Sequence, residues 1–148
     1  MDQALNKHAF RFWTKPLNHA RLLYGIRSAI KEISVAMQSI TVMSDRRKIR
    51  ILLKDIICAY HSARRTRIIT IEDEIETYDT FRSVTAQLTK ICFFQTHASC
   101  FVNLNYVTDY NKTDVVLSYG GHTYHAFISR RKYAAFDKRF KECSCELR

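Results

Sequence analysis

Apolar positions along the chain change their period near residue 38. Between residues 18 and 38 they recur every three or four positions, which is typical of an amphipathic helix of about five turns. Asn18 precedes this helix and can cap it. From Ser39 onward the apolar positions alternate or run in short blocks, as strands do. The apolar positions of the helix are Leu22, Leu23, Ile26, Ala29, Ile30, Ile33 and Met37.

The region after Ser39 reads as short antiparallel strands with two helices. Turns are expected at Asp45–Arg47 and at Gly120–Gly121, each between two strand blocks. Thr80 can cap a helix that places Phe81, Val84 and Leu88 on one stripe, and a last helix carries Tyr133, Phe136 and Phe140. The strand blocks are residues 10–14, 40–44, 48–53, 55–60, 67–71, 74–78, 101–107, 114–119 and 123–128.

Charge narrows the choice of partner. The chain has 24 Lys and Arg against 14 Asp and Glu, a net charge of +10, which favours a polyanion: nucleic acid first and an anionic membrane surface second. No apolar run approaches the roughly 18–20 residues that a membrane span needs, and the N-terminus lacks the apolar core of a secretion signal. We therefore expect a cytoplasmic protein that does not enter a membrane.

Candidate chemistry is sparse. The five cysteines are odd in number and irregularly spaced, which favours reduced thiols over a disulfide framework. Cys143 and Cys145 form a lone pair without the second pair that a zinc site needs. The acidic residues between 72 and 76 read as a solvated hairpin turn. The sequence also lacks a Gly-rich phosphate loop and a nucleophile elbow, so we expect no metal, cofactor, small-molecule substrate or catalytic residue.

One stretch, residues 93–106, resembles the core motif of the LytTR DNA-binding domain. The matching residues are Phe94, His97, Ser99, Val102, Asn103 and Tyr106. Residues 53–57 and 120–130 are similar to two further motifs of that family, in the same order. The resemblance covers residues 39–148 and implies a mostly β, elongated antiparallel fold with short helices. Its loops would enter successive major grooves of bent double-stranded DNA.

The segment before it, residues 1–38, resembles the last strand and helix of a two-component receiver domain. Lys15 falls on the receiver lysine, Pro16 on the proline after it, and Phe12 on the aromatic switch residue. The resemblance implies a receiver remnant without its phosphoacceptor aspartate, so we expect no phosphorylation by the usual route. The apolar stripe of residues 18–38 would then join two copies as a homodimer on direct repeats.

The same resemblance implies three DNA-contact regions. Arginine suits them because its planar fork pairs with phosphate or guanine. This sequence departs from the family at Gln95 and Ala98, where basic or amide residues are usual, and His97 and Asn103 can equally serve structural hydrogen bonds. The expected contacts are Arg64, Arg65, Thr66 and Arg67; Gln95, His97, Ala98 and Ser99; and Arg130, Arg131 and Lys132.

Three functions stay open at this point. The first is a sequence-specific DNA-binding transcription regulator of the response-regulator type. The second is an interaction protein that titrates a full-length regulator or occupies its sites without activating them. The third is an RNA-binding module, which the basic charge and the aromatic residues would permit.

Overall fold

Helix α1 (His19–Ala36) belongs to the first of two compact units, Met1–Gln38 and Ser39–Arg148. The computed structural model describes residues 18–88 and 92–146. The strand expected at residues 10–14, together with Phe12, Lys15 and Pro16, lies outside the described residues.

The start and the apolar face of α1 follow from its sequence. The Asn18 side chain accepts a hydrogen bond from the backbone N–H of Ala20 at 3.0 Å, so the expected cap is confirmed. The apolar stripe is exposed within the chain, with Ile30 and Ile33 both about three-fifths accessible to solvent (60% and 63%). The helix therefore presents an apolar surface that a second molecule can cover.

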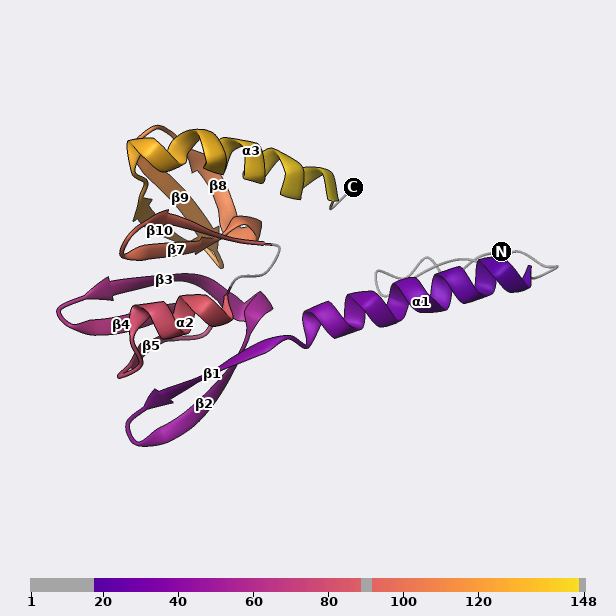
Figure 1. Ribbon diagram of the computed structural model, residues 1–148, viewed down its shortest axis with the longest axis horizontal. Helices are drawn as coiled ribbons and strands as arrows, with labels where there is room; N and C mark the ends of the chain where they lie inside the picture. The colour runs from indigo at the N-terminus through magenta and orange to yellow at the C-terminus, as the bar shows by residue number, and fades with distance from the viewer. Residues whose placement is uncertain (1–17, 89–91, 147–148) are drawn as a thin grey trace. The chain divides into compact units, whose positions relative to one another are not determined.

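The second unit is mostly β, as expected, and holds three antiparallel sheets (Figure 1). The two-stranded sheet is β1 (Ser39–Ser44) and β2 (Arg47–Leu52), and a 3-10 turn, η1 (Leu53–Asp55), follows it. The five-stranded sheet has the order β5-β4-β3-β7-β6, from β3 (Ile56–Ser62), β4 (Arg65–Thr70), β5 (Glu74–Thr77), β6 (Phe93–His97) and β7 (Cys100–Asn103). The three-stranded sheet has the order β10-β9-β8, from β8 (Val107–Tyr110), β9 (Asp114–Tyr119) and β10 (His122–Phe127). The helices are α2 (Phe81–Gln87) and α3 (Arg130–Glu146).

The five-stranded sheet is covered on both faces, which explains the unbroken apolar run of β3. Ile56 and Ala59 belong to one core cluster with β1, β2 and α2, where Val84 is fully buried. Ile57 belongs to the other cluster, with the three-stranded sheet and α3, where Phe136 is fully buried. A strand buried on both faces loses the apolar–polar alternation of a half-exposed strand. The cap on α2 is also confirmed, because the Thr80 hydroxyl accepts from the N–H of Ser83 at 3.2 Å.

Three hairpins turn through pairs of residues with positive φ. These pairs are Asp45–Arg46 (φ 46° and 63°), Ala63–Arg64 (49° and 66°) and Gly120–Gly121 (57° and 82°). Such pairs match the twist of a hairpin, but residues with a Cβ are strained there. The strands expected at residues 55–60 and 67–71 left a six-residue connection between them, which is too long: β3 continues to Ser62 and β4 begins at Arg65, so only Ala63–Arg64 turns.

The prediction of a single strand over residues 101–107 is also wrong. β7 ends at Asn103, a 3-10 turn, η2 (Leu104–Tyr106), follows, and β8 starts a different sheet at Val107. The buried Asn103 makes the break: its amide donates to the Ile56 carbonyl at 2.8 Å, and its Oδ1 accepts from the Asn105 N–H at 3.0 Å. Asn103 therefore has the structural role that its position at a strand end allowed.

Candidate nucleic-acid interface

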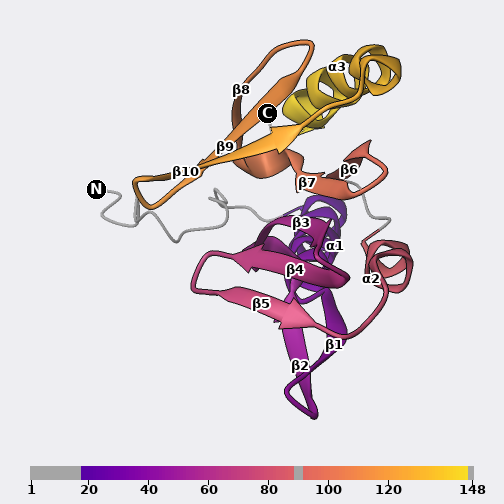
Figure 2. The ribbon, with the colours of Figure 1, turned by 90° about the vertical axis from the view of Figure 1, so that its left-hand side faces the viewer.

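The three expected contact regions meet along one edge of the second unit. The N–H of His61 in β3 donates to the Ser99 carbonyl at 2.9 Å, which joins β3 to the β6–β7 turn. The N–H of Ser129 donates to the Thr96 carbonyl at 3.0 Å, which joins β6 to the start of α3. We call the set Ala63–Arg64, Ala98–Ser99 and Arg130–Lys132 the contact row. In Figure 2 its parts follow one another upward, from the β3–β4 turn to the start of α3.

In the β3–β4 hairpin, Arg64 is exposed and Thr66 is buried. Arg64 is exposed at the turn, between two paired strands. Thr66 is 1% exposed, and its hydroxyl donates to the Asp79 carbonyl at 3.0 Å. Thr66 therefore supports the turn from within, so we expect the exposed Arg64 beside it, and not the Thr66 side chain, to be the residue of this turn that reaches DNA.

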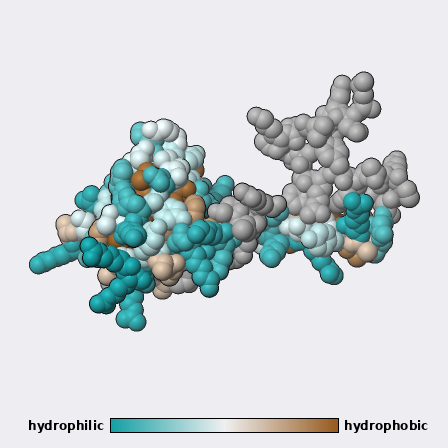
Figure 3. Space-filling model, turned by 90° about the horizontal axis from the view of Figure 1, so that it is seen from above, coloured by the Kyte–Doolittle hydropathy of each residue, from teal (hydrophilic) through white to brown (hydrophobic). Residues whose placement is uncertain are grey.

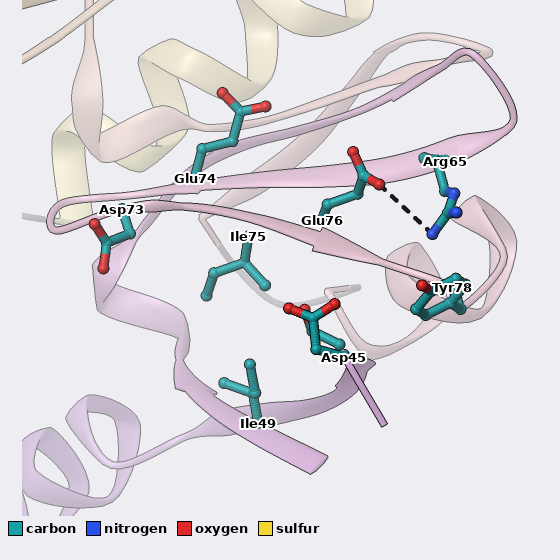
Figure 4. A pocket seen from close by; sticks show the side chains of 9 residues that line it. Asp45, Ile49, Arg65, Asp73, Glu74, Ile75, Glu76 and Tyr78 are labelled. Carbon is teal, nitrogen blue, oxygen red and sulfur yellow. Dashed lines mark ion pairs between the residues drawn. The ribbon is translucent and has the colours of Figure 1, made fainter. Parts of the chain in front are cut away.

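Arg65 and Arg67 flank this turn and are held by carboxylates of β5. Arg67 pairs with Glu74 at 3.1 Å and with Glu76 at 3.4 Å, and Arg65 pairs with Glu76 at 3.5 Å (Figure 4). The Arg65 guanidinium also lies 4.1 Å from the centre of the Tyr78 ring. The pKa of Arg65 is raised by Tyr78 and by the nearby carboxylates, and that of Arg67 by Tyr60 and Glu74.

This pairing gives Glu74 and Glu76, two of the acidic residues of 72–76, a role beyond a solvated turn. Arg67 and Glu76 are directly opposite in the β4–β5 register. The signal was present in the sequence as arginines at alternate positions of one strand and glutamates at alternate positions of the next. The expectation of a solvated turn overlooked it. The carboxylates orient the two guanidinium groups and also offset part of their charge.

Replacing Glu76 with glutamine is expected to tighten DNA binding roughly twofold to fivefold, the range of an exposed ion pair. The carboxylate competes with phosphate for Arg65 and Arg67, and glutamine removes that competition while keeping the side-chain length. Titration of labelled duplex DNA by fluorescence anisotropy measures the change. Glu72→Gln is the matched control, since it raises the net charge equally but Glu72 has no ion pair among the described residues. Equal gains for both variants would contradict the competition.

The strained turn allows the Arg64 charge to be removed without loss of fold. The double variant Ala63→Asn with Arg64→Gly creates the Asn-Gly pair that this turn prefers. We expect its free energy of unfolding to rise by about 1–2 kcal/mol, because the strain at positive φ is relieved. We expect its DNA binding to weaken and the salt slope to fall by about 1, because one phosphate contact is lost. Ala63→Asn alone keeps Arg64 and serves as the control. Equal DNA affinity of the two variants would remove Arg64 from the interface.

The β6–β7 turn is fixed by His97 and Ser99. The Ser99 N–H donates to His97 Nδ1 at 3.2 Å, and the Ser99 hydroxyl lies 2.8 Å from the same atom. A backbone N–H can only donate, so Nδ1 is an acceptor and the neutral ring carries its proton on Nε2. The imidazole also packs edge-on against Phe127, with ring centroids 5.2 Å apart. His97 therefore braces the turn through its Nδ1 atom.

The two positions that depart from the family pattern differ in exposure. Ala98 is exposed at the tip of the β6–β7 turn, where it can contact only an apolar group such as a thymine methyl. Gln95 is half-buried in β6, opposite Phe101 of β7. Neither position therefore places a basic side chain at this turn.

The start of α3 completes the contact row. Arg130, Arg131 and Lys132 are all exposed in its first turn, where the Lys132 N–H donates to the Ser129 carbonyl at 2.9 Å. The helix is held from below by Phe136, whose ring lies 5.4 Å from Phe94 and 5.1 Å from Tyr110. The Tyr110 hydroxyl donates to Asp137 at 2.7 Å, and this bond raises the pKa of Tyr110 to about 12.

The surface near these turns is hydrophilic. Long hydrophilic side chains project from the end of the second unit where these turns gather (Figure 3). Among the described residues there is no group of three or more metal-ligating side chains, and no helix is long and apolar enough to cross a membrane. Cys58 and Cys100 are buried and form no disulfide, and burial raises the pKa of Cys58 to about 12, so this thiol stays protonated.

Comparisons with known proteins point the same way as the geometry. The family model for the LytTr DNA-binding domain matches residues 46–141. The transcriptional regulatory protein NatR of Bacillus subtilis (strain 168) is 29% identical over 90 residues, which are 59% of this chain and 39% of NatR. A solved LytTr DNA-binding domain, from a Bacillus cereus protein described as a putative methyl-accepting/DNA response regulator, superposes with a TM-score of 0.55. It shares 17% identity and covers 69% of this chain and 95% of that domain. The chain belongs to the LytTR family of DNA-binding domains.

Proposed function

We propose that this chain is a sequence-specific, double-stranded DNA-binding transcription regulator of the response-regulator type. The observation that carries the proposal is the contact row, in which three exposed elements of a LytTR domain are joined by two backbone hydrogen bonds. Arg64 and Arg130 would bind phosphates or guanine edges, and the braced His97–Ser99 turn would sit between them. Arg65, Arg67, Arg131 and Lys132 would add phosphate contacts, and Gln95 and Ala98 would supply weaker base contacts.

Fluorescence anisotropy with labelled duplex DNA tests this proposal. We expect the logarithm of the association constant to fall linearly with the logarithm of salt concentration, because bound phosphates release counterions. Unlabelled duplex DNA should displace the label better than single-stranded RNA of the same length. A chain that prefers the RNA would instead be the RNA-binding module, and a chain that binds neither would contradict the proposal.

We further propose that the exposed stripe of α1 pairs with a second copy, so that a dimer occupies direct repeats. Its five apolar positions alternate in spacing between three and four, as in the seam of a two-stranded coiled coil. Gel filtration at micromolar concentration should give the mass of a dimer for the native chain and of a monomer for Ile30→Glu with Ile33→Glu. A native chain that elutes as a monomer contradicts the pairing. The stripe residues are Leu23, Ile26, Ile30, Ile33 and Met37, between 41% and 63% exposed.

The same stripe supports a second candidate, an interaction protein that titrates a full-length regulator or occupies its DNA sites. This candidate predicts that the chain co-elutes with a full-length regulator through α1. Loss of that complex in the Ile30→Glu, Ile33→Glu variant, with DNA binding by the second unit unchanged, would favour titration over direct regulation.

A further inference from the structure

The β1–β2 hairpin concentrates positive charge that the contact row does not include. Arg46 lies in the turn, and Arg47 and Lys48 follow it directly on β2. All three side chains are exposed, and successive strand residues point to opposite faces of the hairpin. None of the ion pairs found among the described residues includes any of them. In contrast, Arg65 and Arg67 form ion pairs with glutamates of β5.

The hairpin is fastened beside the β3–β4 turn. The Met43 carbonyl accepts from the Tyr78 N–H at 3.1 Å and from the Thr77 hydroxyl at 2.7 Å, and the Met43 N–H donates to Asp79 at 2.8 Å. Asp45 lines the same pocket as Arg65 and Tyr78 (Figure 4). The tip of the hairpin is therefore held next to one end of the contact row.

The order of the elements matters for a rod-shaped ligand. From the bottom of Figure 2 upward come the β1–β2 tip, the β3–β4 turn, the β6–β7 turn and the start of α3. A duplex that lies along the contact row and continues past Arg64 runs over the β1–β2 tip. Its phosphates repeat every few ångströms, and guanidinium and ammonium groups bind phosphate without regard to base sequence.

We propose that the β1–β2 tip is a fourth DNA-contact element, in which Arg46, Arg47 and Lys48 bind the backbone phosphates beyond the β3–β4 turn. The inference rests on the proposed DNA-binding function and extends it. The tip adds affinity and fixes the position of the domain on the duplex, while base recognition stays with the other three elements.

The test compares the native chain with Arg47→Gln, Lys48→Gln on a mixed-sequence duplex of about 30 base pairs, over a range of salt concentrations. The control, Lys54→Gln with Lys138→Gln, removes the same charge from exposed positions elsewhere, at η1 after β2 and two turns into α3. Arg46→Gly is a third variant, and it creates the Asp-Gly pair that the turn prefers. Circular dichroism melting verifies that each variant is folded.

We expect the salt slope to fall by about 2 for Arg47→Gln, Lys48→Gln and by about 1 for Arg46→Gly, with little change for the control. Shortening a preferred duplex at the end that lies over the hairpin should weaken DNA binding by the native chain and leave binding by the hairpin variant unchanged. Shortening it at the other end should not distinguish the two chains in this way. A hairpin variant with the native slope, or with no greater loss than the control, overturns the inference. If Arg130→Ala still weakens binding in that case, the proposed function stands without it. A native chain that does not bind duplex DNA overturns both.

Discussion

Arg130→Ala is expected to weaken binding to a preferred duplex by about 1–3 kcal/mol, which is about 5- to 150-fold. Arg130 is exposed at the first position of α3, where its fork can reach a guanine edge or a phosphate. If Arg130 reads a base, discrimination at one base pair should relax as well. Anisotropy titrations with the preferred duplex and its single-base-pair variants measure both effects.

Lys138→Ala is the control for this prediction. It removes the same charge from an exposed position two turns further along the same helix. Its effect should be confined to a small, sequence-independent loss. If Arg130→Ala and Lys138→Ala weaken DNA binding equally and leave the preference among duplexes unchanged, then Arg130 contributes only its charge.

Phe136→Ala is expected to lower the free energy of unfolding by about 3–5 kcal/mol. Phe136 is fully buried, and its ring contacts Phe94, Tyr110 and Phe140 at centroid distances of 5.4, 5.1 and 6.2 Å. Truncation leaves a cavity beneath the helix that carries Arg130. Urea unfolding followed by circular dichroism measures the loss. Phe127→Ala, at a residue 57% exposed, should cost much less. Equal losses would show that the α3 packing is not the main support.

Elements with a regular period could be predicted from the sequence. Gly120–Gly121 marks its hairpin because glycine tolerates positive φ, and this turn is confirmed at φ 57° and 82°. Thr80 and Asn18 cap their helices as expected. The Ala63–Arg64 turn was harder to place, because neither residue favours the conformation that it adopts there. The pairing of β3 with β4 on both sides of the turn imposes this conformation, and the local sequence pattern does not show which residues will pair.

The sequence predicted which segments form the candidate site, but it did not predict the hydrogen bonds and ion pairs between them. The resemblance placed Arg64, Arg130 and the 95–99 segment together, and the hydrogen bonds from His61 and Ser129 describe how they adjoin. Burial of Thr66 could not be predicted, because the contact that buries it comes from Asp79 after β5. Likewise, a run such as residues 101–107 reads as one strand until Asn103 bonds to Ile56 from a distant part of the chain.

We propose that the contact row reads the base sequence of duplex DNA. Selection from a pool of random-sequence duplexes by the native chain, followed by sequencing, tests this claim most directly. We predict that the pool converges on one sequence, and that single base-pair changes in it cost about 1–3 kcal/mol of binding free energy. A pool that stays random, or that yields duplexes bound no more tightly than the starting mixture, would contradict sequence-specific recognition and leave only a basic DNA-coating surface.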